Sequence, residues 1–74
     1  MKSIEIKLCI MRSITGNDYT RKELSQKVLE WFSDEGKQFL KQLWTDKMLY
    51  VSNWGTVRLT PKGWNKLSDL QKEL

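Results

Sequence analysis

The segment from Leu49 to Trp64 restricts the possible folds of this chain more than any other part of the sequence. It reads LYVSNWGTVRLTPKGW and alternates apolar and polar residues on both sides of an Asn-Trp-Gly corner. This alternation predicts a β-hairpin over residues 48–60 with one buried face. Asn53 and Gly55 tolerate the positive φ values that tight corners need, so Trp54 is expected at or beside the tip. The side chains expected to face the core are Leu49, Val51, Val57 and Leu59.

A helix is predicted to begin as soon as the hairpin ends. Thr60 is an N-cap residue, and Pro61 stands at the first helical position, where the N–H that proline lacks would have no partner anyway. We therefore expect a last helix over residues 61–73. Its apolar side would carry Trp64, Leu67, Leu70 and Leu74.

The N-terminal region predicts another helix and a turn. The apolar residues of MKSIEIKLCIMRSI fit either the alternation of a strand or the spacing of a helix, and we favour a helix over residues 3–14. Ser3 is the candidate N-cap, and residues 16–18, Gly-Asn-Asp, supply a stop and a turn. Cys9 is expected to be a small buried apolar side chain.

The clearest helix-start signal follows this turn. Thr20 and Glu23 form the S/T-x-x-E capping box, and Tyr19 can pack on Leu24 as a hydrophobic staple. A second helix is therefore predicted over residues 21–32. Its inward side would carry Leu24, Val28, Trp31 and Phe32.

Ser33 is a further N-cap candidate and predicts a third helix over residues 34–46. On a helical wheel, one side of this helix is apolar and carries Phe39, Leu40, Leu43 and Trp44. The opposite side is polar and without acidic residues, and it carries Lys37, Gln38, Lys41, Gln42 and Thr45. The predicted order is helix, helix, helix, hairpin, helix, in one domain spanning residues 1–74.

This order resembles the winged helix-turn-helix family. The resemblance covers roughly Ile4 to Leu70, and its most specific part is LKQLWTDKMLYVS followed by VRLTPKGWNKL. These segments are similar to the recognition-helix end, wing and final helix of winged-helix regulators of the MarR and PadR kinds, whose Leu-Thr-x-Lys-Gly motif is present at residues 59–63. The expected fold class is therefore α+β, mostly α: a three-helix bundle with a helix-turn-helix, a two-stranded β-hairpin wing and a C-terminal helix.

The resemblance implies binding of double-stranded DNA, with the helix over residues 34–46 in the major groove and the wing along the backbone or the minor groove. Lys37 and Lys41 can pair with phosphates or with guanine edges. Gln38 and Gln42 can make the two-point contact that distinguishes adenine. The residues that would flank this surface are Thr45, Lys47, Tyr50 and Arg58.

Two positions depart from the usual family pattern. Met48 stands where a glycine usually separates the recognition helix from the wing, so the helix must end through Asp46 or Lys47. Trp54 stands at the wing tip, where many family members carry Arg or Lys. An indole there either folds back over the hairpin or stands in solvent as an anchor, and the sequence leaves both open.

Charge and composition favour a binding protein over an enzyme. The chain has 13 Lys and Arg against 9 Asp and Glu, a formal charge of +4, and Asp46 is the one acid among six basic residues between Gly36 and Lys66. The chain has no histidine and one cysteine, which excludes a His-based triad, an internal disulfide and a zinc site. No carboxylates form a convincing catalytic pair, so we predict no catalytic residue, cofactor or metal.

The expected function is that of a small cytoplasmic transcriptional regulator or DNA-architecture factor, of the size that mobile elements often encode. The cytoplasmic location is expected because the sequence has no signal-peptide pattern and no apolar run of the roughly 20 residues that span a bilayer. Self-association or cooperative binding on DNA is expected, because dimers are the usual route to adequate affinity. The alternative is a protein-binding winged-helix adaptor or inhibitor that uses Trp54, Tyr50 and the last helix. For the polar helix side, the alternative is an ordinary solvated surface.

Overall fold

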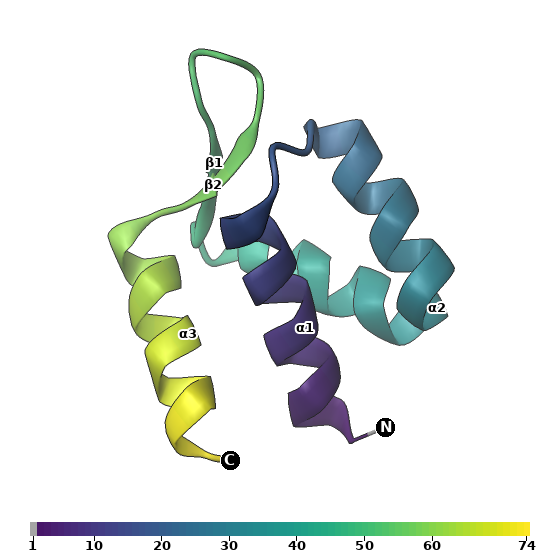
Figure 1. The fold of residues 1–74 in the computed structure, drawn as a ribbon, viewed down its shortest axis with the longest axis vertical. Coiled ribbons are helices and arrows are strands. Elements are labelled where there is room, and N and C mark those ends of the chain that lie inside the picture. The colour runs from purple at the N-terminus through teal and green to yellow at the C-terminus, as the bar shows by residue number, and fades with distance from the viewer. Residues whose placement is uncertain (1) are drawn as a thin grey trace.

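The apolar positions of the sequence assemble into one core among the helices, and the hairpin projects from it (Figure 1). The computed structural model describes residues 2–74. Within these residues the elements are α1 (Ser3–Gly16), α2 (Arg21–Thr45), β1 (Leu49–Val51), β2 (Val57–Leu59) and α3 (Pro61–Lys72). The protein is therefore α+β and mostly helical, as the sequence predicts. α1 lies between α2 and α3 and contacts both.

The predicted second and third helices form one element, α2, that bends sharply at Ser33 (Figure 1). Ser33 has φ 53° and ψ −142°, which interrupts the helical geometry. The break falls where the sequence predicts it, although a positive φ is not the extended conformation usual for an N-cap. Gly36 lets the two halves approach closely, since an added Cβ would lie 2.7 Å from Phe32 Cβ and 2.9 Å from Val28 Cγ1. We call residues 21–32 and 34–45 the first and second halves of α2.

Local hydrogen bonds define both ends of α2. Thr20 Oγ1 accepts from the Glu23 N–H at 3.2 Å, and Glu23 Oε1 accepts from the Thr20 N–H at 3.3 Å, so the predicted capping box is confirmed. At the other end Lys47 has φ 58°, and the Met48 N–H donates to Leu43 O at 2.9 Å. This is the backbone pattern in which a left-handed residue closes a helix. The prediction that the helix ends through Asp46 or Lys47 is confirmed, with Asp46 as the C-cap and Lys47 in the left-handed conformation.

α1 begins at Ser3, as predicted, and ends two residues later than predicted. Lys2, not Ser3, is the N-cap residue, because the Lys2 N–H donates to the carboxylate of Glu5 at 3.0 Å. Ser3 is the first helical residue, so the predicted cap is wrong. The helix continues to Gly16, and the Asn17 side chain donates to Ser13 O at 3.0 Å in the last turn. The choice of helix over strand is confirmed.

β1 and β2 pair antiparallel, with Leu49 opposite Leu59, Tyr50 opposite Arg58 and Val51 opposite Val57. Leu49, Val57 and Leu59 are buried as predicted. Val51 is 46% exposed, so its predicted burial is wrong. Val51 is exposed because its strand lies farther from the helices than β2 does. The Val57 N–H donates to Tyr19 O at 2.8 Å, so β2 lies between β1 and the turn before α2. β1 is the outer strand, and its far end extends beyond the core.

Two tryptophans expected in the core lie on the surface. Trp31 is 41% exposed and Trp64 is 52% exposed. The core is filled by aliphatic side chains, many of them from α1, together with Phe39. Trp31 packs edge-on against Tyr19 and Phe32 at the rim, with ring centroids 6.4 and 6.3 Å apart. On α3 the predicted Leu67 and Leu70 are buried, together with Gly63, whereas Trp64 and Leu74 are exposed.

Thr60 and Gly63 join the hairpin to α3. Thr60 Oγ1 accepts from the Gly63 N–H at 3.1 Å and donates to Lys47 O at 2.8 Å, so the predicted cap is confirmed and also contacts the turn that follows α2. Gly63 is buried against the backbone of Met48, and a Cβ at Gly63 would collide with the Met48 carbonyl oxygen. The Leu-Thr-x-Lys-Gly motif therefore has a packing role in this chain.

We predict that Gly63→Ala lowers the free energy of unfolding by about 3 kcal/mol, because the Met48 carbonyl belongs to the backbone and cannot turn away. The matched control is Gly16→Ala at the end of α1, where an added Cβ meets nothing within 4 Å. This control should change stability by less than about 1 kcal/mol. Urea unfolding followed by circular dichroism measures both. Equal midpoints for the two variants would contradict the close approach of α3 to Met48.

Candidate functional site

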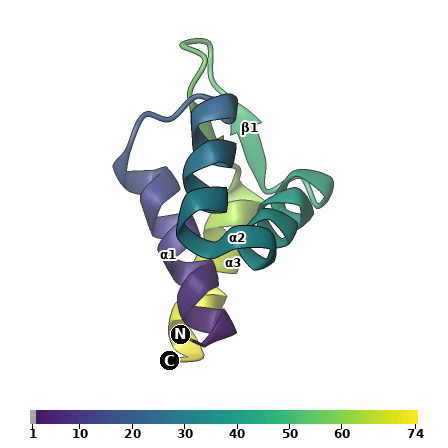
Figure 2. The same ribbon diagram turned by 90° about the vertical axis from the view of Figure 1, so that its right-hand side faces the viewer.

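The second half of α2 separates apolar from polar side chains. Phe39, Leu40 and Leu43 are buried, whereas all five residues of the predicted polar side are exposed. These five are Lys37, Gln38, Lys41, Gln42 and Thr45. Acidic side chains are confined to the start of this half, at Asp34 and Glu35. The second half of α2 leads through a short turn into β1 (Figure 2), so this exposed surface adjoins the hairpin.

A cavity of about 400 Å³ lies in the angle between the two halves of α2. It is lined by Arg21, Ser25, Lys37, Leu40, Lys41, Trp44 and Thr45. The cavity divides the predicted set: Lys37, Lys41 and Thr45 border it, whereas Gln38 and Gln42 are exposed to solvent outside it. Among the described residues that line this cavity, three are basic and none is acidic. We refer to it as the α2 cavity.

Arg21 is a member of this site that sequence reasoning missed. It is the first residue of α2, and its Cζ lies over the Trp44 ring, 4.2 Å from the ring centroid. Trp44 is half-buried and packs against the core, as its place at the edge of the apolar side predicts. No local pattern indicates the contact, because Arg21 and Trp44 stand at opposite ends of α2 and meet only through the bend at Ser33.

The residues predicted to flank the surface differ in whether their side chains already bind another group of the protein. Lys47 and Tyr50 are exposed, and Tyr50 is the ladder partner of Arg58. Arg58 is not free: its Nη2 lies 2.6 Å from Asp18 Oδ1, and its Nη1 donates to Asn17 O at 3.3 Å. Arg58 therefore ties the base of the hairpin to the turn before α2.

Trp54 stands in solvent at the tip of the hairpin, with 90% of its surface exposed. Of the two alternatives that the sequence leaves open, the indole takes the outward one. Ser52 organises the turn, because its Oγ accepts from the N–H groups of Trp54 and Thr56 at 3.3 Å and its carbonyl accepts from Gly55 at 2.9 Å. Gly55 has φ 80°, the left-handed conformation expected at this corner. The indole is thus carried by a turn with its own hydrogen bonds.

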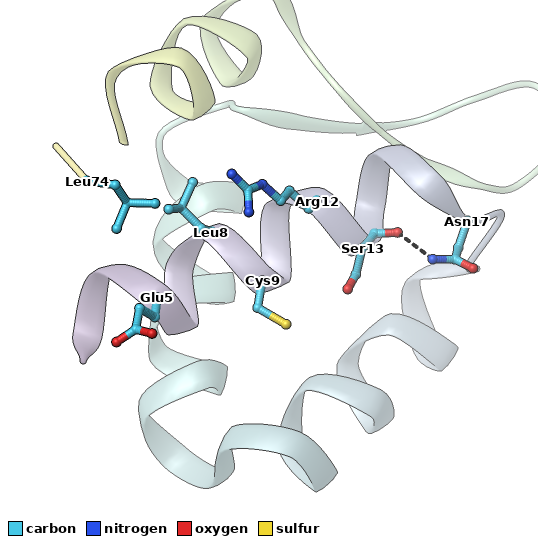
Figure 3. A pocket seen from close by; sticks show the side chains of 7 residues that line it. All are labelled: Glu5, Leu8, Cys9, Arg12, Ser13, Asn17 and Leu74. Atoms are coloured by element: carbon cyan, nitrogen blue, oxygen red, sulfur yellow. Dashed lines mark hydrogen bonds between the residues drawn. The ribbon is translucent and has the colours of Figure 1, made fainter. Parts of the chain in front are cut away.

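A second cavity, of about 560 Å³, lies on the outer side of α1 (Figure 3). It is lined by Glu5, Leu8, Cys9, Arg12, Ser13, Asn17 and Leu74. Cys9 is exposed, so its predicted burial is wrong. The helix turns Ile6, Ile10 and Ile14 inward, and Cys9 falls on the opposite side. Within residues 2–74 no group of three His, Cys, Asp or Glu side chains could hold a metal ion.

Two separate regions therefore stand out: the basic α2 cavity with its polar helix surface, and the apolar hairpin tip. No described helix is long and apolar enough to cross a membrane. Comparison of the chain with protein-family models, with curated proteins and with solved structures finds no match.

We predict that the Cys9 thiol in the folded protein reacts with iodoacetamide within about tenfold of its rate in the denatured chain. A buried thiol would react only after unfolding, which for a domain of ordinary stability slows labelling on the order of 1,000-fold. Mass spectrometry measures the two rates, and Cys9→Ser gives the background. A protection factor near 1,000 would contradict the orientation of α1.

Proposed function

We propose that this protein binds double-stranded DNA as a winged helix-turn-helix domain. The bend at Ser33, the one non-helical residue inside α2, sets the two helical halves at an angle, as the two helices of a helix-turn-helix are set. The hairpin after the second half corresponds to the wing. The hydrogen bond from the Val57 N–H to Tyr19 O supports this proposal. It attaches β2 of the hairpin to the turn before α2, so the hairpin and the two halves of α2 form one unit. In this reading the second half of α2 is the recognition helix.

The observation that carries the proposal is the charge of one exposed surface. Lys37 and Lys41 project from the second half of α2, and Arg21 reaches the same cavity from the first half. Among residues 2–74 the one ion pair joins Arg58 to Asp18, so these three basic side chains have no acidic partner. Unpaired cations on one surface favour a polyanion such as the DNA backbone.

The mechanism assigns different tasks to the charged and the amide side chains. Lys37 and Lys41 neutralise phosphates and set the position of the helix on the duplex. Gln38 and Gln42, exposed beside them, read base edges in the major groove. Thr45 and Lys47 extend the surface toward the hairpin. Arg58 serves mainly to hold the hairpin, since a phosphate contact would require it to leave Asp18. Such a protein acts as a small transcriptional regulator or a DNA-architecture factor.

The test compares two double variants of equal charge. Lys37→Glu with Lys41→Glu changes the formal charge from +4 to 0, and so does the control, Lys27→Glu with Lys72→Glu, at exposed residues outside the cavity. We expect the first pair to lose at least about tenfold in affinity for random duplex DNA relative to the control. The slope of log K against log salt should also fall, since each phosphate contact contributes about 0.9.

Fluorescence anisotropy at 50 and 200 mM salt, first on random duplex and then on DNA that flanks the gene, provides both quantities. Thermal unfolding of each variant confirms that it is folded. Equal affinities for the two double variants would place the DNA surface elsewhere on the protein. A wild type that binds no duplex at low salt would end the proposal, because even non-specific contacts register under that condition.

A second candidate function rests on Trp54. An indole that is 90% exposed, with Tyr50 and Val51 also about half exposed on the adjoining strand, is the kind of apolar surface that anchors protein partners. In that case the protein is an adaptor or inhibitor that uses the hairpin tip and α3. The two functions assign the sensitive residues to different parts of the molecule.

We expect Trp54→Ala to change DNA affinity by less than about twofold and stability by less than about 0.5 kcal/mol, because the indole packs on nothing in the free protein. The same anisotropy titration and thermal unfolding measure these effects. A variant that binds DNA like the wild type but is inactive in cells would favour the protein-binding function. A variant that loses DNA affinity would make the hairpin tip part of the DNA surface.

A further inference from the structure

We propose that Trp44 is a positioning residue that holds the Arg21 guanidinium at the mouth of the α2 cavity, so that Arg21, Lys37 and Lys41 bind one phosphate group together. The inference rests on the proposed function in so far as that phosphate belongs to the DNA backbone. It adds a residue and a contact that the resemblance to winged-helix proteins does not supply. It also assigns a ligand class, the phosphate group, to a particular cavity.

The first argument is the contact between Arg21 and Trp44. The Arg21 Cζ lies 4.2 Å from the centre of the indole, inside the range of about 6 Å over which cations interact with aromatic rings. Arg21 itself is exposed, and without this contact its long side chain would sample many conformations. The indole therefore restricts the guanidinium to one side of the cavity.

The second argument is that the Trp44 ring, on which the Arg21 guanidinium lies, is itself held in place. Trp44 is half-buried and packs against the core that Leu40 and Leu43 belong to. The close approach of the two halves of α2 at Gly36 sets the angle at which Arg21 meets the ring. A ring held by the core can position a flexible side chain, whereas an exposed ring would move with it.

The third argument is that the cations around the cavity have no protein partner. The carboxylate nearest to Arg21 in sequence, that of Glu23, accepts the Thr20 N–H and does not line the cavity. The ion pair of the described chain joins Arg58 to Asp18 instead. Three like charges around one cavity of about 400 Å³ repel each other, and an anion between them relieves that repulsion.

The chemistry of the lining fits a phosphate. A guanidinium presents two parallel N–H donors to two phosphate oxygens, and the ammonium groups of Lys37 and Lys41 supply point charges for the others. The hydroxyl groups of Ser25 and Thr45 border the same space and can donate to phosphate oxygens. The same group occurs in the DNA backbone and in free inorganic phosphate, so the experiment uses both.

The DNA arm is a double-mutant cycle on random duplex. Trp44→Leu retains every charge, and we expect it to weaken binding three- to tenfold, whereas Trp44→Phe keeps an aromatic platform and should recover most of the affinity. Arg21→Gln should weaken binding by at least as much and lower the salt slope by about 1. With Arg21→Gln already present, Trp44→Leu should have no further effect. Trp64→Leu, an exposed indole on α3 outside the cavity, is the control and should bind like the wild type.

The phosphate arm uses inorganic phosphate and NMR. Millimolar phosphate should shift the indole N–H signal of Trp44 and the Nε–H signal of Arg21 in the wild type. The same titration should leave the Trp44 signal unmoved in Arg21→Gln. Thermal unfolding of all variants identifies any that are unfolded, and Trp44→Phe keeps the test decisive if Trp44→Leu does not fold.

The outcomes separate the two proposals. Additive effects of Trp44→Leu and Arg21→Gln on DNA affinity would overturn the positioning role while leaving DNA binding intact. Phosphate shifts at Trp44 in a protein that binds no DNA would support the phosphate site and refute the proposed function. No phosphate shift and no DNA binding would overturn both.

Discussion

The bend in α2 is the constraint on which the rest of the structure depends. A straight helix of 25 residues would be about 37 Å long, which exceeds the 33 Å that the whole molecule extends along its longest axis. The break at Ser33 turns the second half back so that the apolar sides of both halves reach the core. Gly36 makes this possible, because any side chain there would collide with Val28 and Phe32. The bend also creates the α2 cavity and brings Arg21 over Trp44.

The core consists of aliphatic side chains together with Phe39, and the tryptophans lie at its edge or on the surface. α1 supplies Ile6, Leu8, Ile10, Met11 and Ile14, and the other elements contribute mainly Leu and Val. A chain of 74 residues encloses too little volume to bury four indoles as well. Trp44 is half-buried, and the other three tryptophans are more exposed. The exposed Trp54 is available for contacts with other molecules, whereas the half-buried Trp44 is held by the core and carries the Arg21 side chain.

Arg58 and the three basic residues of the α2 cavity have different tasks. Arg58 is committed to Asp18 and Asn17, and through them it fixes the hairpin to the turn before α2. Arg21, Lys37 and Lys41 have no such partners within the described chain and lie around one cavity. The formal charge of +4 does not reveal this division. What matters for binding a polyanion is the group of cations that no carboxylate neutralises.

The sequence by itself determined the features that depend on a few neighbouring residues. The capping box of Thr20 and Glu23, the Thr60 cap and the hairpin corner each involve side chains and backbone groups within four residues of one another. Their hydrogen bonds form as soon as the chain adopts the local conformation, so residue type and spacing are enough to predict them. The exposed polar side of residues 37–45 was predictable for the same reason, since it follows from the helical period.

Only the tertiary structure decided which apolar residues are buried and which distant side chains meet. Cys9, Val51 and Trp64 carry the hydrophobic character of core residues, but no other element covers the side on which each of them lies. The contact of Arg21 with Trp44 joins residues 23 positions apart, and its existence depends on the angle at Ser33. Burial of a hydrophobic side chain lowers the free energy of the folded protein. Whether it is buried depends on the packing of the whole chain, which no local pattern contains.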